Sequence, residues 1–216
     1  MPAKVKICGI TEEKSLKTAI NENADFIGFV FFEKSPRNIS IEEASKLIKL
    51  MPDNIKSVAL TVNETKENIE KIITETNVDY IQLHGSETID TIKWIKDNFT
   101  VKIIKAIPIA NKEDLEQIKI YQNICDFILL DAKPMENELP GGNGLKFDWN
   151  LIKTLKLNTQ WMLAGGLNPD NVSSAIQLTQ PNVVDVSSGV ESSAGIKNNN
   201  KIIRFIKNSR NNLNVH

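Results

Sequence analysis

Short apolar runs recur along the chain of 216 residues. Each run is four to seven residues long and rich in residues that favour strands, which is typical of buried strands. Successive runs begin about 25 residues apart, the spacing of strand–helix units whose strands are parallel. We therefore predict eight strands, at residues 5–8, 26–32, 57–62, 80–83, 101–107, 127–130, 161–164 and 183–186.

Most segments between these runs show the spacing of amphipathic helices. Apolar residues at Ile41, Ala44, Leu47 and Ile48 recur at helical intervals, and residues 172–176 show the same pattern. Eight alternating strand–helix units predict a single closed (β/α)8 barrel, the TIM barrel. An open, doubly wound sheet is the competing architecture, but the turn after the first run lacks the G-x-G-x-x-G pattern of dinucleotide-binding sheets.

Polar residues that favour helix starts precede three of the helical segments. Thr11, Ser40 and Asn63 are each followed within two residues by a glutamate, so we place helix starts there. The longest connections follow the second and sixth runs, at residues 33–40 and 132–146. Extra length at these two places predicts a functional role for both loops.

Length and composition limit the number of domains, the class of partner and the chemistry of the cysteines. One domain is expected over residues 1–216, with a frayed polar tail at about 208–216. Lys and Arg number 26 against 27 Asp and Glu, so charge gives no argument for nucleic acid or an anionic membrane as a partner. Without a membrane-spanning run or a signal peptide, we expect a cytoplasmic protein. The only cysteines, Cys8 and Cys125, lack metal-ligand spacing, which predicts reduced thiols and no zinc site.

Chemically reactive side chains gather where the predicted strands end. In a parallel barrel the active site lies at the carboxyl ends of the strands, and Cys8, His84 and Asp131 occupy such positions. Arg37, in the loop after the second run, offers a planar donor fork suited to a carboxylate. Taken singly, each has a plainer interpretation: a buried thiol, a strand-end histidine, a capping aspartate and a solvated arginine. Their shared position favours an acid–base site.

Two small, glycine-bearing loops follow the last two strands. Gly165 and Gly166 follow the seventh, and Ser187, Ser188 and Gly189 follow the eighth. Glycine lets backbone amides approach a phosphate, and a short helix beginning near Ser188 would add its N-terminal donors. Either loop alone would also fit an ordinary strand-to-helix turn, but the pair is the usual phosphate site of such barrels.

A glycine-rich segment, residues 139–144, lies within the long loop after the sixth strand and contains Gly142 and Gly144. We interpret this segment as a flap over the site, although an ordinary long loop is the plainer alternative.

Together these motifs resemble the phosphoribosylanthranilate isomerase family in order and spacing. The resemblance extends from residue 4 to about residue 207. It is carried by Lys6-Ile7-Cys8-Gly9, Ser35-Pro36-Arg37, Gln82-Leu83-His84-Gly85, Leu130-Asp131, Gly141-Gly142-Asn143-Gly144, Phe147-Asp148-Trp149, Ala164-Gly165-Gly166-Leu167 and Asp185-Val186-Ser187-Ser188-Gly189-Val190-Glu191.

The resemblance implies an Amadori rearrangement of N-(5′-phosphoribosyl)anthranilate that needs no cofactor or metal. Asp131 would act as general acid on the furanose ring oxygen, and Cys8, as partial thiolate, would remove the C2′ proton. Arg37 would hold the anthranilate carboxylate. Backbone amides around Gly166 and Ser188 would hold the phosphate, while the flap would exclude water. Asn143 departs from the Thr or Ser usual in the family, which leaves the hydrogen bonding of the closed flap open.

Two rivals remain. A related barrel isomerase of histidine biosynthesis performs the same rearrangement but uses two aspartates and binds two phosphates, so Cys8 argues against it. A non-catalytic sugar-phosphate-binding module would keep the phosphate loops without turnover, and the presence of both Cys8 and Asp131 argues against that. The partner expected is a small-molecule substrate, and either a monomer or a homodimer is compatible with the sequence.

Overall fold

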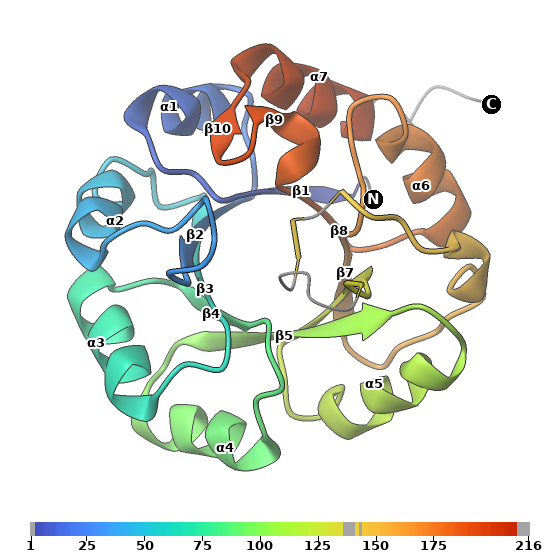
Figure 1. Ribbon diagram of the computed structural model, residues 1–216, viewed down its shortest axis with the longest axis horizontal. Helices are drawn as coiled ribbons and strands as arrows, with labels where there is room; N and C mark the ends of the chain where they lie inside the picture. The colour runs from blue at the N-terminus through green and yellow to red at the C-terminus, as the bar shows by residue number, and fades with distance from the viewer. Residues whose placement is uncertain (1–2, 136–140, 143, 211–216) are drawn as a thin grey trace.

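The structure is a computed structural model that describes residues 3–135, 141–142 and 144–210. Eight parallel strands follow one another around a closed barrel, and β1 pairs with β8 to complete it (Figure 1). The predicted barrel is therefore confirmed, and the open sheet is excluded. The strands are β1 Lys4–Cys8, β2 Phe26–Phe31, β3 Lys56–Thr61, β4 Tyr80–Leu83, β5 Lys102–Ile109, β6 Phe127–Ala132, β7 Gln160–Leu163 and β8 Val183–Val186.

Helices surround the barrel in most crossovers, as Figure 1 shows. The connection from β6 to β7 differs, since its only described helix is the three-residue 3-10 turn η2, Trp149–Leu151. No helix in the described part of the chain is both long and apolar enough to cross a membrane. The other elements are α1 Glu13–Asn21, α2 Ile41–Ile48, α3 Lys66–Thr76, α4 Ile89–Asn98, η1 Glu113–Leu115, α5 Glu116–Tyr121, α6 Val172–Thr179, η3 Ser188–Val190, β9 Glu191–Ser193, β10 Ile196–Lys197 and α7 Asn199–Arg210.

Strand alternation divides the apolar side chains into two cores. One core lies between the strands and the helices, and the other fills the barrel itself. Inside the barrel, Phe26, Tyr80 and Phe127 meet edge to face, with ring centroids 5.5–6.0 Å apart. These rings start strands β2, β4 and β6, so they fill the amino-terminal end of the barrel. Interior positions nearer the carboxyl ends hold the polar groups Lys6, Gln82 and Asp185 as well as an apolar cluster of Cys8, Val30 and Leu60.

A repeated hydrogen bond joins each odd strand to the loop before the next even strand. The side chain just before the even strand accepts from a main-chain amide near the start of the preceding odd strand, in each case at 2.8–2.9 Å. An amide that the sheet leaves without an acceptor is thereby satisfied. The acceptor–donor pairs are Asp25 with Val5, Asp79 with Ser57, Asp126 with Ile103, and Asn182 with Trp161.

Two of the three predicted helix starts need correction. Ser40 caps α2 in a reciprocal capping box with Glu43, as expected. The cap of α3 is Thr65 rather than Asn63, because Asn63 adopts a left-handed conformation and its side chain accepts from the Ser86 amide instead. The first helix begins two residues after Thr11, at Glu13, without a side-chain cap.

The tail also begins later than predicted, because α7 continues to Arg210. Asn208 donates to the Pro169 carbonyl, and Ser209 is buried with its hydroxyl bonded to the Phe205 carbonyl. These contacts keep residues 208–210 in the fold. The remainder of the expected tail, residues 211–216, lies outside the described residues.

The hydrogen bond from the Ser57 amide to the Asp79 side chain predicts a specific effect on stability. Replacing Asp79 with alanine leaves the Ser57 amide without a hydrogen-bond acceptor. This loss should lower the free energy of unfolding by about 1–3 kcal/mol in urea titrations. Asp79→Asn keeps an acceptor, as Asn182 does in the equivalent place, and should cost clearly less. Equal losses of unfolding free energy in the two variants would contradict a stabilising role for this hydrogen bond.

The same residue predicts a pH effect. Partial burial acts to raise the pKa of Asp79, but hydrogen bonds from Ser57 and Lys56 outweigh it, so this pKa lies below its ordinary value. The carboxylate therefore stabilises the fold above the pKa of the unfolded chain, and the contribution is lost as pH falls through the folded-state pKa. The stability difference between the wild type and Asp79→Asn should shrink over that acid range.

Candidate active site

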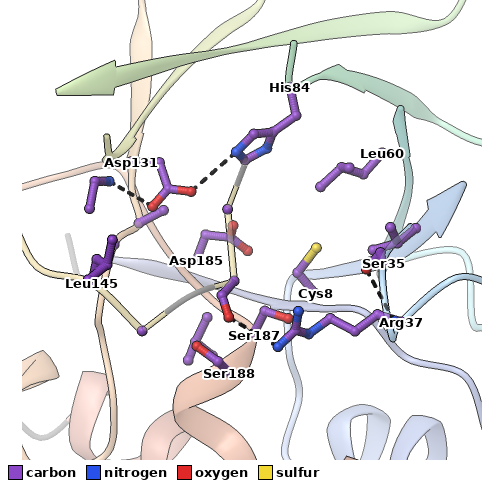
Figure 2. Close-up of a pocket in the computed structure, with 18 of the residues that line it drawn as sticks. Cys8, Ser35, Arg37, Leu60, His84, Asp131, Leu145, Asp185, Ser187 and Ser188 are labelled. Atoms are coloured by element: carbon purple, nitrogen blue, oxygen red, sulfur yellow. Dashed lines mark hydrogen bonds and ion pairs between the residues drawn. The ribbon is translucent and has the colours of Figure 1, made fainter. Parts of the chain in front are cut away.

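The carboxyl ends of the strands enclose a cavity of about 260 Å³ (Figure 2). It brings together residues from β1, β2, β3, β6 and β8 and from the loops after β2, β3, β4, β6, β7 and β8. All of the predicted site residues line it except Gly189. The lining thus includes Cys8, Arg37, His84, Asp131, Gly142, Gly144, Gly165, Gly166, Ser187 and Ser188.

Cys8 ends β1 and is almost completely buried, with 4% of its surface exposed. Its register partner on β2 is Gly28, and a Cβ placed on Gly28 would lie only 2.7 Å from the Cys8 sulfur. Glycine at this position therefore provides the room that the thiol occupies. Burial raises the pKa of the Cys8 thiol, while the cations Lys6 and Lys197 act to lower it.

Asp131 lies within β6, near its end, and both of its carboxylate oxygens have hydrogen-bond donors. Oδ1 accepts from the Ala132 amide at 2.8 Å, and Oδ2 lies 3.2 Å from His84 Nε2. Gln82 Nε2 lies 2.7 Å from the other ring nitrogen, Nδ1, and can only donate to it. This bond leaves the ring hydrogen of a neutral His84 on Nε2, where it points at Asp131. His84, which follows β4, therefore contacts the predicted acid.

Arg37 is buried against a partner that the sequence interpretation missed. Its Nε and Nη2 atoms donate to the two carboxylate oxygens of Glu191, each at 2.8 Å, and Nη2 also donates to the Gly142 carbonyl. The donor fork expected to take a substrate carboxylate is therefore largely committed to Glu191. Nη1 donates to none of the described residues, so it is the part of the guanidinium left for a ligand.

Glu191 connects two cations beneath the cavity. Its Oε1 atom accepts from Lys197 Nζ at 2.7 Å as well as from Arg37. Burial acts to raise the pKa of Glu191, but Arg37 and Lys197 outweigh it and hold this pKa at about 2. Lys197 Nζ also donates to the carbonyl and hydroxyl of Ser187, which fixes the loop after β8.

The loops after β7 and β8 offer backbone donors to the cavity. Gly166 and Ser188 line it, and the amide of neither residue donates a hydrogen bond to any residue in the described ranges. The predicted short helix is present as η3, although three residues provide a weaker dipole than a full helix. Gly189 faces away, because a Cβ there would run into the Leu167 carbonyl; it lets the two loops pack closely.

The described part of the predicted flap lies over the acid and the arginine. A Cβ on Gly141 would lie 2.9 Å from His84 Nε2, and one on Gly142 would lie 2.5 Å from Arg37 Nη1. Both glycines have positive φ angles, so side chains there would be strained as well as obstructed. Asn143 and residues 139–140, part of the same prediction, lie outside the described residues.

Sequence reasoning also missed a buried ion pair below Cys8. Lys6 is fully buried, and its Nζ atom lies 3.0 Å from Asp185 Oδ1, across the junction that closes the barrel. A lysine two residues before Cys8, within an apolar strand, was the available signal. Among the described residues, no group of three or more His, Cys, Asp and Glu side chains could hold a metal ion.

Comparison with known proteins identifies the family. Residues 5–208 match the family described as PRAI, N-(5′-phosphoribosyl)anthranilate (PRA) isomerase. The chain belongs to this family. An N-(5′-phosphoribosyl)anthranilate isomerase of Paramagnetospirillum magneticum is 41% identical to it over 97% of this chain and 98% of that protein.

Solved structures of PRA isomerases agree with this assignment. The phosphoribosyl anthranilate isomerase of Thermotoga maritima superimposes with a TM-score of 0.88 at 38% identity, covering 97% of this chain and 99% of that one. A PRA isomerase in complex with reduced 1-(o-carboxyphenylamino)-1-deoxyribulose 5-phosphate superimposes with a TM-score of 0.85 at 37% identity, with the same coverage. The likeness thus extends over nearly the whole barrel.

The close approach of Gly28 and Cys8 predicts that Gly28→Ala displaces the thiol. Because small misplacements of a reacting group are costly, kcat/KM should fall by at least about tenfold. The clash should also destabilise the fold. In a Cys8→Ala background most of that destabilisation should disappear, because the sulfur that the new methyl group meets is gone. A double-mutant cycle by urea unfolding would measure this coupling, and additive losses would contradict it.

Proposed function

We propose that this chain catalyses the Amadori rearrangement of N-(5′-phosphoribosyl)anthranilate to 1-(2-carboxyphenylamino)-1-deoxyribulose 5-phosphate, a step of tryptophan biosynthesis. The observation that carries the proposal is the placement of Cys8 and Asp131 on separate rigid strands around one cavity (Figure 2). A proton can then be delivered to one part of a substrate and removed from another. Family membership and the analogue bound to a related isomerase support the same reaction.

Asp131 is the proposed general acid. It would protonate the furanose ring oxygen, the C1′–O bond would break, and the anthranilate nitrogen would share the resulting positive charge as an iminium ion. The carboxylate left behind is stabilised by the Ala132 amide and by the hydrogen on His84 Nε2. His84, held by Gln82, would keep a hydrogen-bond donor directed at that carboxylate.

Cys8 is the proposed general base. It would take the C2′ proton, the electrons of that C–H bond would neutralise the iminium ion, and an enolamine would form. Tautomerisation of the enolamine to the ketone completes an isomerisation in which no atom is gained or lost. Burial works against the thiolate in the empty cavity, and the positive charge of the iminium ion favours it once the ring has opened.

The two ends of the cavity suit the two anionic groups of the substrate. The free amides of Gly166 and Ser188 are suited to the phosphate, since main-chain donors can converge on an anion. Arg37 Nη1 is suited to the anthranilate carboxylate, and Glu191 keeps the guanidinium in place for it. No step of this route calls for a cofactor or a metal.

The decisive experiment follows the fluorescence of phosphoribosylanthranilate generated in the assay. The wild type should consume it much faster than the spontaneous background, whereas Cys8→Ala and Asp131→Asn should each lose at least about a hundredfold in kcat. Absence of turnover by the wild type would overturn the proposal, and measurable binding without turnover would indicate a sugar-phosphate-binding module. Turnover surviving in one variant would remove that residue from the mechanism.

Because Nε and Nη2 of Arg37 donate to Glu191 and Nη1 is left for a ligand, Arg37→Lys should weaken substrate binding. Lysine can still pair with Glu191 but cannot also present a second nitrogen to the substrate carboxylate. KM should rise by about tenfold or more, with a smaller change in kcat. An anthranilate-free sugar phosphate used as a competitive inhibitor should keep its affinity. Loss of that affinity as well would show that Arg37 acts on the whole site rather than on the carboxylate.

A further inference from the structure

The lysine beneath Cys8 differs from Lys105, a buried lysine of β5. Lys105, 3% exposed, donates to three main-chain carbonyls and to Glu87, so its ammonium is fully satisfied. Lys6 is completely buried, yet its ammonium donates to one oxygen among the described residues, that of Asp185. A buried ammonium has three hydrogens to place, and leaving them without acceptors is costly.

Strand geometry places the thiol of Cys8 on the same face as the Lys6 ammonium, whose other hydrogens still need acceptors. The two residues are two positions apart on β1, so both side chains point into the barrel. A thiol can accept a hydrogen bond from an ammonium, and the interaction of Cys8 with Lys6 favours the charged form of both groups. On β2 the facing residue is Gly28, which contributes no charge.

The buried charges around this point are not balanced. Lys6, Arg37 and Lys197 are cations, whereas Asp185 and Glu191 are the carboxylates paired with them. Three positive charges against two negative ones leave room for one further anion. Cys8 is the group in this cluster that can become one by losing a proton. The remaining titratable groups that line the cavity, His84 and Asp131, bond to each other instead.

We propose that Lys6 is a positioning residue that stabilises the thiolate of Cys8, and that Asp185 sets how strongly it does so. The inference rests on the proposed function, in which Cys8 is the general base. Asp185 takes one hydrogen of the ammonium and part of its charge, which limits what Lys6 offers to the sulfur. The two residues therefore act on Cys8 in opposite directions, whereas a purely structural ion pair would give both substitutions the same effect.

The test titrates Cys8 directly, without substrate. In a Cys125→Ala background Cys8 is the only thiol, and its alkylation by iodoacetamide can be followed against pH. Lys6→Met should raise the midpoint of that profile by about one unit or more, a tenfold loss of thiolate below the midpoint. Asp185→Asn should lower it. Lys105→Met, which removes an equally buried and paired lysine, should leave the midpoint in place.

Two results would overturn the inference. One is an unchanged midpoint in a folded Lys6→Met protein, and the other is a shift of the same sign in Lys6→Met and Asp185→Asn. Circular dichroism establishes folding, and if Lys6→Met does not fold, the direction of the shift in Asp185→Asn still decides.

Turnover of phosphoribosylanthranilate by the parent protein is measured separately. Absence of turnover would therefore count against the proposed function. An unchanged midpoint of the alkylation profile would count against this inference. Where turnover is present, the acid limb of kcat/KM should move with the alkylation midpoint.

Discussion

The pairing of β1 with β8 is the contact on which the site depends. It closes the barrel and places Lys6 directly opposite Asp185, so that two charges more than 170 residues apart in sequence form an ion pair 3.0 Å long. Closure also puts the thiol at the end of β1 beside the loop after β8. Without this pairing, the proposed base and the loop proposed to bind the phosphate would belong to opposite edges of a sheet.

Closure creates an interior that holds aromatic rings at one end and both charged and apolar side chains toward the other. Aromatic rings fill the amino-terminal end, so the polar side chains above them lie in a place from which water is largely excluded. In such surroundings charges have strong effects on one another, and each needs a partner. The pairing of Arg37 and Lys197 with Glu191 meets that need, and it also fixes the guanidinium and the loop that carries Ser187.

The proposed acid and the proposed base are held in different ways. Asp131 is held by hydrogen bonds, from the main chain and from a histidine whose tautomer Gln82 sets. Cys8 is held by packing against Gly28 and by nearby cations. The cations beside Cys8 act against the effect of its burial, which raises the pKa of the thiol.

The sequence by itself determined the barrel, the polarity of its strands and the residues that line its mouth, because strand alternation and strand-end chemistry are local properties of the chain. It placed all but Gly189 of the predicted residues in one cavity. Only the tertiary structure decided which charges pair. Glu191 takes the donors of Arg37, and Asp185 pairs with Lys6 beneath Cys8, because the fold joins segments distant in sequence. Such partnerships depend on distances across the barrel, and no local pattern encodes them.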